Sequence, residues 1–379
     1  MLKNKGTITS FQLGILSFFL GSALFPGFGT SIIINQADED SWLIPLFSLV
    51  IAFIPLIIII YIMEFEPNKN ILEKNKIIFG NTFGNIINFL LIMGMLVLFG
   101  IIIWSGAYTT IFLYAGETPY LFLAGLSTII FYYAVSKGLT IISRVGEILF
   151  YGGILLIIIV VFSLYPWVDT EKIFPICKNG PLAVISQSLI LLCYAYPPLI
   201  TLTMIPKNKI KDNTHYKKYL IIGFLASLIL LSIVYFMITT VLTISLAQLY
   251  RYPEAYIQRK IVIGDFITGL ENFLNIHWYF NFFILATLTL YFISEYSKSL
   301  FKLKKEKSLK LNISLICILG LLISYFIFKG RAIFALDFMQ KKFHYLISAP
   351  LLIITLLIML GIFRKKRLFQ KQSKLLKQQ

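Results

Sequence analysis

Ten apolar runs, each about as long as a bilayer is thick, divide this chain of 379 residues. A transmembrane helix needs about 20 apolar residues to cross a hydrocarbon core of about 30 Å. Only helices and closed barrels can satisfy their backbone polar groups in that core. Charged or turn-forming residues bound the runs, which predicts an all-α polytopic membrane protein with ten transmembrane helices. The predicted spans cover residues 11–35, 42–63, 84–113, 119–136, 146–166, 182–206, 218–246, 274–298, 311–328 and 344–363.

The charge of the chain fits this interpretation. Charged residues make up 13% of the sequence and hydrophobic residues 58%, whereas about 25% of residues are charged in soluble domains. The net charge of +17 is compatible with nucleic-acid binding. The basic residues, however, lie in short connections between apolar runs. We therefore predict a single integral membrane domain over residues 1–379 in contact with a lipid bilayer, and no nucleic-acid partner.

The distribution of Lys and Arg predicts the orientation in the membrane. Of the 34 Lys and Arg residues, 23 lie in the N-terminal segment, in the connections after every second span, and in residues 364–379. The positive-inside rule then places both termini in the cytoplasm and makes residues 364–379 a basic cytoplasmic tail that contacts anionic lipid. On the outer side, the mixed sequence of residues 247–273 predicts one or two short amphipathic helices at the membrane interface.

The first and sixth spans are each interrupted near the middle. The first contains Pro26 among several glycines, and the sixth contains Pro197 and Pro198 within residues 193–198. Proline removes a backbone donor and glycine leaves helical geometry without steric cost. Kinks and glycine-lined contacts are common in membrane helices, so one such break alone indicates little. Two breaks, one opening each predicted five-helix repeat (residues 7–166 and 182–363), favour the solute site of an inverted-repeat transporter fold.

A broken helix offers free N–H groups to an anion and free carbonyl groups to a cation. Two such breaks can hold both ends of a zwitterionic amino acid. The candidate ligand-binding residues are Gly21, Ser22, Phe25, Pro26, Gly27, Gly29 and Thr30 in the first span, Tyr108 in the third, Cys193, Tyr194, Tyr196 and Pro197 in the sixth, and Thr287 in the eighth. Taken singly, each of these residues is also typical of helix packing.

Two charged residues stand at the inner end of the fifth span. Arg144 and Glu147 are three residues apart and share one helical face. They form either an inner gate or a local ion pair at the interface. Catalytic patterns are missing, since the sequence has neither a phosphate-binding loop nor an H-E-x-x-H motif. The three histidines lie in or beside three different connections, so we expect no metal, no cofactor and no enzymatic activity.

Several short motifs resemble those of the spore germinant receptor B-subunit family. They are Thr-Ile-Thr-Ser-Phe-Gln at residues 7–12 with Leu-Phe-Pro at 24–26, Asp-Ser-Trp at 40–42, Arg-Val-Gly-Glu at 144–147, and an outer-loop segment from Tyr252 and Pro253 through residues 261–266 to Glu271. Each motif is weak alone, and their order and spacing make the resemblance specific. It covers residues 7 to about 300, and the region beyond is similar only in hydropathy.

The resemblance implies a LeuT-type fold of five plus five inverted spans. It implies a subunit that binds a small germinant, usually an amino acid, at the unwound parts of the first and sixth spans. That subunit works beside A and C subunits in the inner membrane of a bacterial endospore. This chain departs from the family pattern at residues 193–198, which contain no acidic residue, so the partner of an ammonium group is unassigned. A secondary amino-acid transporter coupled to protons or sodium, and a structural subunit with an empty pocket, are the competing hypotheses.

Overall fold

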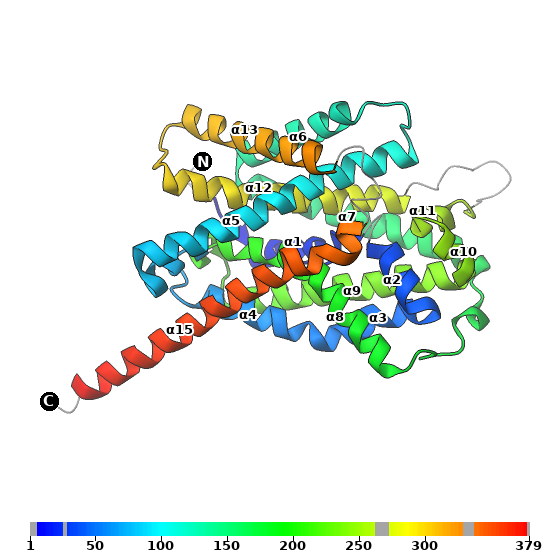
Figure 1. Cartoon of the computed structure of the whole chain (residues 1–379), viewed down its shortest axis with the longest axis horizontal. Coiled ribbons are helices and arrows are strands. Elements are labelled where there is room, and N and C mark those ends of the chain that lie inside the picture. The colour runs from blue at the N-terminus through cyan, green and yellow to red at the C-terminus, as the bar shows by residue number, and fades with distance from the viewer. Residues whose placement is uncertain (1–5, 26–28, 262–272, 329–336, 377–379) are drawn as a thin grey trace.

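The computed structural model describes residues 6–25, 29–261, 273–328 and 337–376, with side chains up to residue 368, and helices dominate it (Figure 1). The first half contains β1 (Ile8–Thr9), α1 (Ser10–Ser22), α2 (Thr30–Ala37), the 3-10 turn η2 (Asp38–Trp42), α3 (Leu43–Ile51), α4 (Phe53–Glu64), α5 (Ile71–Leu113), α6 (Tyr120–Lys137) and α7 (Leu139–Leu164). Two short 3-10 turns, η3 (Tyr165–Trp167) and η4 (Thr170–Ile173), lead to the second half.

The second half begins with α8 (Pro181–Leu199), which continues into the 3-10 turn η5 (Ile200–Met204). After η6 (Lys207–Lys209) and β2 (Ile210–Lys211) come α9 (Tyr216–Val241), α10 (Ile244–Leu249), α11 (Pro253–Gln258), α12 (Phe273–Leu300) and α13 (Glu306–Ile323). Wider π-type turns η8 (Ser324–Phe328), η9 (Phe338–Lys342) and η10 (His344–Ser348) precede α15 (Ala349–Leu376), which projects beyond the bundle in Figure 1.

These helices account for the predicted spans. Within the described ranges, nine helical stretches are long and apolar enough to cross a membrane, and α1 is a shorter apolar helix. One of the nine stretches is Thr30–Glu64, of 35 residues. Asp38, with a φ of 50°, ends α2 inside that stretch and separates the first predicted span from the second.

The third span has an additional helical segment at its start. The helix α5 is 43 residues long, but Gly80 interrupts it with a φ of 81° and a ψ of 175°. The Asn75 Nδ2 atom donates to Asn88 Oδ1 at 2.7 Å, although 13 residues of straight helix would separate these residues by about 20 Å. Residues 71–79 therefore fold back against the start of the spanning helix, and glycine permits the left-handed turn that this requires.

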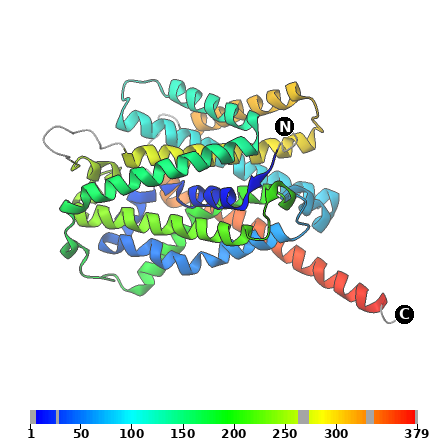
Figure 2. The ribbon, with the colours of Figure 1, turned by 180° about the vertical axis from the view of Figure 1, so that it is seen from behind.

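The innermost helix is α1, which lies against α9 in the middle of the bundle (Figures 1 and 2). A Cβ atom on Gly223 of α9 would lie 2.0 Å from the carbonyl oxygen of Gly14. The Ser17 hydroxyl donates to the Leu220 carbonyl at 2.9 Å, one turn further along α1. Small residues thus let the two backbones touch, as is usual where membrane helices associate.

The start of α1 is tied to both halves of the chain. In the two-stranded parallel sheet, Ile8 of β1 pairs with Ile210 and Thr9 pairs with Lys211 of β2. The Thr9 and Gln12 side chains cap the helix reciprocally, at 3.0 and 3.1 Å. The Gln12 Nε2 atom also donates to Glu147 Oε2 of α7 at 2.8 Å. This end of α1 is therefore held in place by α7 and by the segment that follows α8.

The predicted partners Arg144 and Glu147 are not joined to each other. Arg144 is exposed, and among the ion pairs of the described residues none links it to Glu147. Glu147 instead accepts the hydrogen bond from Gln12. The local ion-pair alternative therefore does not describe this pair, and Glu147 hydrogen-bonds to α1 instead.

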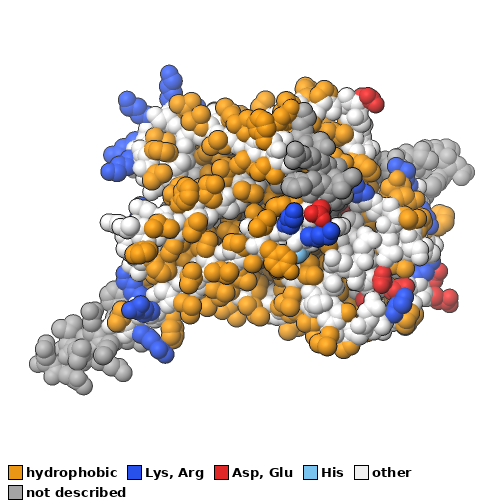
Figure 3. Space-filling view, in the orientation of Figure 1, with side chains coloured by type: hydrophobic (Ala, Val, Ile, Leu, Met, Phe, Trp, Pro, Cys, Tyr) orange, Lys and Arg blue, Asp and Glu red, His pale blue; other side chains and the backbone are white. Residues whose placement is uncertain are grey.

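The surface has the pattern expected of a membrane protein. Figure 3 shows a broad, mostly apolar face between two ends, with Lys and Arg at both ends and acidic side chains mainly at the end opposite the tail. Large apolar residues such as Val50, Phe162 and Ile148 are exposed on the surface of the protein, at 76%, 75% and 72%. Lipid is the environment that makes so much apolar exposure favourable.

We expect Gly223→Ala to destabilise the protein by about 1–3 kcal/mol, because the added methyl group meets backbone atoms that have no room to move. Gly152→Ala in α7 is the matched control, since nothing lies within 4 Å of its added Cβ. Thermal unfolding of the detergent-solubilised proteins measures the difference. Equal unfolding temperatures for both variants would contradict the close contact of α1 with α9.

We also expect Glu147→Ala to lower stability by about 1 kcal/mol through loss of the hydrogen bond to Gln12. Arg144→Ala, on the same helix, should change stability by less than about 0.5 kcal/mol because the side chain is exposed. The same unfolding assay compares the two. A larger loss from Arg144→Ala than from Glu147→Ala would show that the wrong residue has been assigned to this contact.

Candidate functional site

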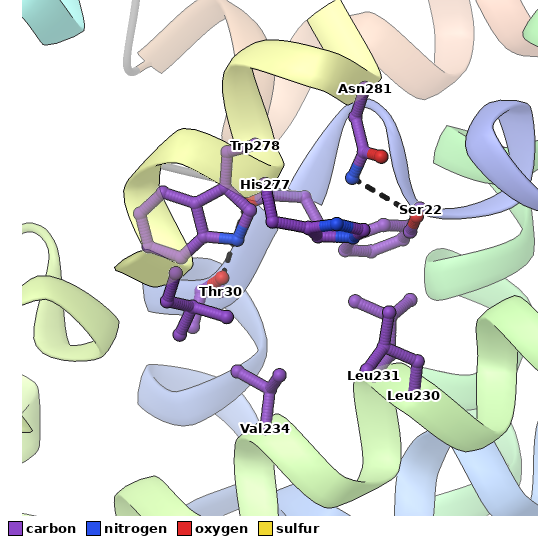
Figure 4. A pocket seen from close by; sticks show the side chains of 10 residues that line it. Ser22, Thr30, Leu230, Leu231, Val234, His277, Trp278 and Asn281 are labelled. Atoms are coloured by element: carbon purple, nitrogen blue, oxygen red, sulfur yellow. Dashed lines mark hydrogen bonds between the residues drawn. The ribbon is translucent and has the colours of Figure 1, made fainter. Parts of the chain in front are cut away.

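A small buried cavity lies where the first predicted span is interrupted (Figure 4). It adjoins Ser22, where α1 ends, and Thr30, where α2 begins. Its volume is about 20 Å³, which has room for about one water molecule. The lining residues are Ser22, Phe25, Thr30, Leu230, Leu231, Val234, Leu274, His277, Trp278 and Asn281. They come from the first span, from α9 and from α12.

The polar lining is buried and incompletely hydrogen-bonded. The Asn281 Nδ2 atom donates to the Ser22 hydroxyl at 3.2 Å, as Figure 4 shows. The Asn281 Oδ1 atom and both ring nitrogens of His277 have no hydrogen-bond partner among the described residues. Each of these two side chains is only 1% exposed. Leaving a buried polar group unsatisfied costs about 1–3 kcal/mol, so such atoms indicate a ligand or water site.

The imidazole of His277 is held by close neighbours on two helices. Its ring centroid lies 6.3 Å from that of Phe18 and 6.1 Å from that of Phe19, both on α1. On its other side is Gly153 of α7, where an added Cβ would lie 2.4 Å from the His277 Nδ1 atom. The glycine thus provides the space that the ring occupies, and the ring has little freedom to turn.

The rest of the cavity wall is apolar. Leu230, Leu231 and Val234 of α9 face the polar atoms from the opposite side (Figure 4). None of the lining residues is Asp, Glu, Lys or Arg, and His277 is the one titratable side chain among them. The cavity is therefore suited to a small solute that forms a few hydrogen bonds on one side and apolar contacts on the other.

One side of this region is covered by α11, which contacts α2, α7, α9 and α12. Its Glu254 and Gln258 side chains are fully buried. The Gln258 Oε1 atom accepts from the Leu274 backbone N–H at 2.8 Å, which attaches α11 to the start of α12. The prediction of short helices in this connection is confirmed by α10 and α11, of which α11 is mostly buried in the protein. Their position at the membrane interface stays a prediction. The rest of the outer-loop motif, beyond Ile261, lies outside the described residues.

The predicted residues of the first span divide into three groups. Ser22, Phe25 and Thr30 line the cavity. Gly21 instead belongs to the contact with α9, because its added Cβ would lie 2.0 Å from the Ser227 hydroxyl oxygen. The Gly29 carbonyl accepts from the Tyr235 hydroxyl at 3.4 Å. Pro26 and Gly27 lie outside the described residues.

The described backbone on either side of the interruption in the first span is helical. Ala23 and Gly29, on either side of it, have φ and ψ of −66° and −29° and of −61° and −38°. These are right-handed helical values. The Thr30 hydroxyl donates to the Phe25 carbonyl at 3.1 Å. The described part of the interruption is therefore compact, and unwinding here stays a prediction.

The sixth span is not broken within residues 193–198. The helix α8 continues through Pro197 and Pro198 to Leu199 and only then tightens into η5. The Ile200 N–H reaches the carbonyls of both prolines, and the Thr201 hydroxyl donates to the Pro198 carbonyl at 2.6 Å. These local donors pair the carbonyls of the two prolines where α8 ends. The prediction of a break within residues 193–198 was therefore wrong.

The aromatic residues of the sixth span face another part of the protein. The Tyr194 hydroxyl donates to the Met339 carbonyl at 2.5 Å, and its ring stacks on Phe343 at 5.1 Å. The Tyr196 hydroxyl is hydrogen-bonded to Thr355 of α15. Tyr194 does approach Phe25 of the cavity, with ring centroids 6.0 Å apart. Tyr196 thus connects α8 to α15, Tyr194 connects it to the turns that precede α15, and neither lines the cavity.

The remaining predicted ligand residues lie elsewhere. Tyr108 stacks on Trp104 at 5.2 Å, and its hydroxyl accepts from Arg251 at 2.9 Å near the C-terminal end of α5. The Thr287 hydroxyl donates to the Phe283 carbonyl of its own helix at 2.8 Å. Cys193 is partly buried on α8. None of the three lines the cavity.

Sequence reasoning missed His277, Trp278 and Asn281. A usable signal was present, because positions 277 and 281 are four residues apart at the start of the eighth predicted span and share one helical face. Two polar side chains on one face of a membrane helix are candidates for function. Because His277 lies beside a connection between two predicted spans, it was considered only as a possible metal ligand.

The sequence of this chain is similar to those of known proteins over most of its length. Residues 7–330 match the family described as Spore germination protein, the spore permeases. Spore germination protein KB of Bacillus subtilis (strain 168) is 24% identical over 324 residues, which are 82% of this chain and 82% of that protein. The family motifs in the sequence are thus part of a match over most of the chain.

Two solved structures share the fold. MhsT, in complex with L-phenylalanine, superposes with a TM-score of 0.63 at 13% identity, covering 92% of this chain and 88% of its own. Mhp1, a nucleobase-cation-symport-1 family transporter in a closed conformation with bromovinylhydantoin bound, has a TM-score of 0.61 at 14% identity, covering 88% and 75%. The predicted LeuT-type fold is confirmed, and these relatives are permease-type proteins and not enzymes. From the match over residues 7–330, this chain belongs to the spore germination protein family of permeases.

Proposed function

We propose that this chain is the germinant-sensing membrane subunit of a spore germination receptor, and that it binds a small solute, most simply an amino acid, at the cavity beside Ser22. The observation that carries the proposal is the set of buried, unpaired polar atoms on His277 and Asn281 beside the interruption of the first span. Family membership supports the role in germination. The L-phenylalanine complex of MhsT shows that this fold can hold an amino acid.

The cavity must enlarge for such a ligand to bind. At about 20 Å³ it has room for about one water molecule, whereas an amino acid contains several heavy atoms. Binding therefore favours a conformation in which the first span, α9 and α12 lie further apart. In the proposed receptor, partner subunits of the A and C type respond to this change. The proposed location is the inner membrane of the endospore, with both termini in the cytoplasm.

The polar atoms suggest how a zwitterion is held without a charged side chain. The Asn281 Oδ1 atom and the Ser22 hydroxyl oxygen can accept hydrogen bonds from an ammonium group. A ring N–H of His277 can donate to a carboxylate. The apolar wall at Leu230, Leu231 and Val234 then receives the side chain of the solute.

The second candidate is a secondary amino-acid transporter that works by alternating access, with proton or sodium coupling. The fold shared with Mhp1, itself a transporter, favours it. Both candidates use the same cavity, so they differ in whether the solute crosses the membrane.

Replacing the unpaired polar groups should weaken the response of spores to their germinant. For Asn281→Leu and His277→Phe we expect the half-maximal germinant concentration to rise by about tenfold or more, because each variant removes a hydrogen bond to a charged group worth about 1.5–3 kcal/mol. A germinant panel on spores that carry each variant measures the change.

Thr287→Val on the same helix is the matched control, since the Thr287 hydroxyl donates to backbone carbonyls of its own helix. An unchanged response in both variants, with the protein present in the spore membrane, would refute the site. Uptake of labelled amino acid by vesicles that contain this chain alone, lost in both variants, would instead establish the transporter.

A further inference from the structure

A second hollow lies far from the cavity, beside the basic tail. It is a groove of about 460 Å³ between residues 71–79 of α5 and the helix α15. The lining residues are Ile78, Phe79, Leu357, Leu360, Gly361, Arg364, Lys365 and Leu368. We call it the tail groove.

The tail groove exists because two helices meet at an angle and at close range. The turn at Gly80 directs residues 71–79 back toward the bundle. On α15, an added Cβ at Gly361 would lie 2.5 Å from Ile78 Cγ2 and 2.9 Å from Phe79 Cζ. The Lys365 ammonium group also donates to the Ile77 carbonyl. The walls of the groove are thus fixed to each other.

The groove has an apolar floor and a cationic rim. Its floor is formed by Ile78, Phe79, Leu357 and Leu360, and the last two are 49% and 58% exposed. Arg364 and Lys365 stand at the rim, and no acidic side chain lines the groove. More positive charge follows directly, because residues 364–379 contain seven Lys and Arg residues and no Asp or Glu.

Lysine and arginine beside the rim are supported by aromatic rings. The Lys366 ammonium group lies 4.5 Å from the ring centroid of Tyr61, and the Arg367 guanidinium lies 4.4 Å from that of Phe363. Such contacts hold cationic side chains in place near a surface. The cations near the groove therefore have defined positions, which is unlike a freely moving basic tail.

We propose that the tail groove binds an anionic phospholipid of the inner leaflet, with its phosphate between Arg364 and Lys365 and an acyl chain along Ile78, Phe79, Leu357 and Leu360. Charge complementarity carries the assignment, since basic pockets at this depth bind acidic head groups. The apolar floor is continuous with the lipid-facing band and requires a chain as well as a phosphate. The assignment depends on the cytoplasmic orientation proposed above and is independent of the germinant.

The test uses the full-length protein purified in detergent. It is titrated with phosphatidylglycerol and with phosphatidylcholine, and lipid retention is followed by native mass spectrometry alongside thermal unfolding. We expect the wild type to prefer phosphatidylglycerol. In Arg364→Gln/Lys365→Gln, the phosphatidylglycerol concentration for half-maximal retention should rise about tenfold to thirtyfold. Each of the two basic residues is expected to contribute a similar part of the free energy of binding to the anionic lipid.

Lys304→Gln/Lys305→Gln is the matched control, because it removes the same charge from an exposed connection outside the groove. It should bind phosphatidylglycerol like the wild type. Unfolding in the absence of lipid shows whether each variant is folded. Three results would each overturn the proposal. They are an equal loss of phosphatidylglycerol retention in both double variants, equal retention of the two lipids by the wild type, and displacement of phosphatidylglycerol by glycerol 3-phosphate alone. Displacement by an acidic peptide without an acyl chain would overturn it too and would indicate a protein partner.

Discussion

The contact between the backbones of α1 and α9 determines the rest of the arrangement. Gly14 and Gly223 bring the two helices closer than side chains allow, and Gly21 repeats this two turns later against Ser227. Because α1 is the innermost helix, its contact with α9 determines where α1 ends, at Ser22. The cavity lies beside that end, with α9 on one side and α12 on the other. A membrane protein has no hydrophobic effect to drive such a contact, so close approach has to supply its energy.

The cavity beside Ser22 lowers the stability of the protein in this structure. Three polar atoms on His277 and Asn281 are buried without a hydrogen bond among the described residues, and each such group destabilises the protein by about 1–3 kcal/mol. Close neighbours maintain this arrangement, since Gly153 and the rings of α1 leave the imidazole little freedom. A ligand that satisfies these atoms recovers part of the cost, which is a physical reason for a binding site to be retained there.

The predicted fold followed from hydropathy and the positions of basic residues, because the bilayer restricts the chain to helices of nearly uniform length. Helix α1 ends at Ser22 and α2 begins at Thr30, on either side of Pro26, and unwinding between them stays a prediction. The predicted break in the sixth span is absent, since α8 continues through Pro197 and Pro198. The donors that pair the carbonyls of these prolines, the Ile200 N–H and the Thr201 hydroxyl, lie two to three residues further along the chain. A pair of prolines alone therefore does not predict where a helix unwinds.

The lining of the cavity was harder to predict than its position. Tyr194 and Tyr196 lie at the expected level of the chain, but their direction depends on Phe343 and Thr355, which are more than 140 residues away in sequence. His277 and Asn281 share a helical face that sequence does show. This face meets Ser22 because of the way in which α12 crosses α1. No local sequence pattern predicts that crossing.

The C-terminal helix has a mechanical consequence. As a continuous helix of 28 residues, α15 is about 42 Å long and stiff. It is attached to α8 through Thr355 and to the start of α5 through Lys365, and its far end projects beyond the bundle (Figure 1). A tilt of one degree would displace one end of such a helix relative to the other by about 0.7 Å. The two hydrogen bonds place Tyr196 of α8 and the carbonyl of Ile77 on the same stiff element.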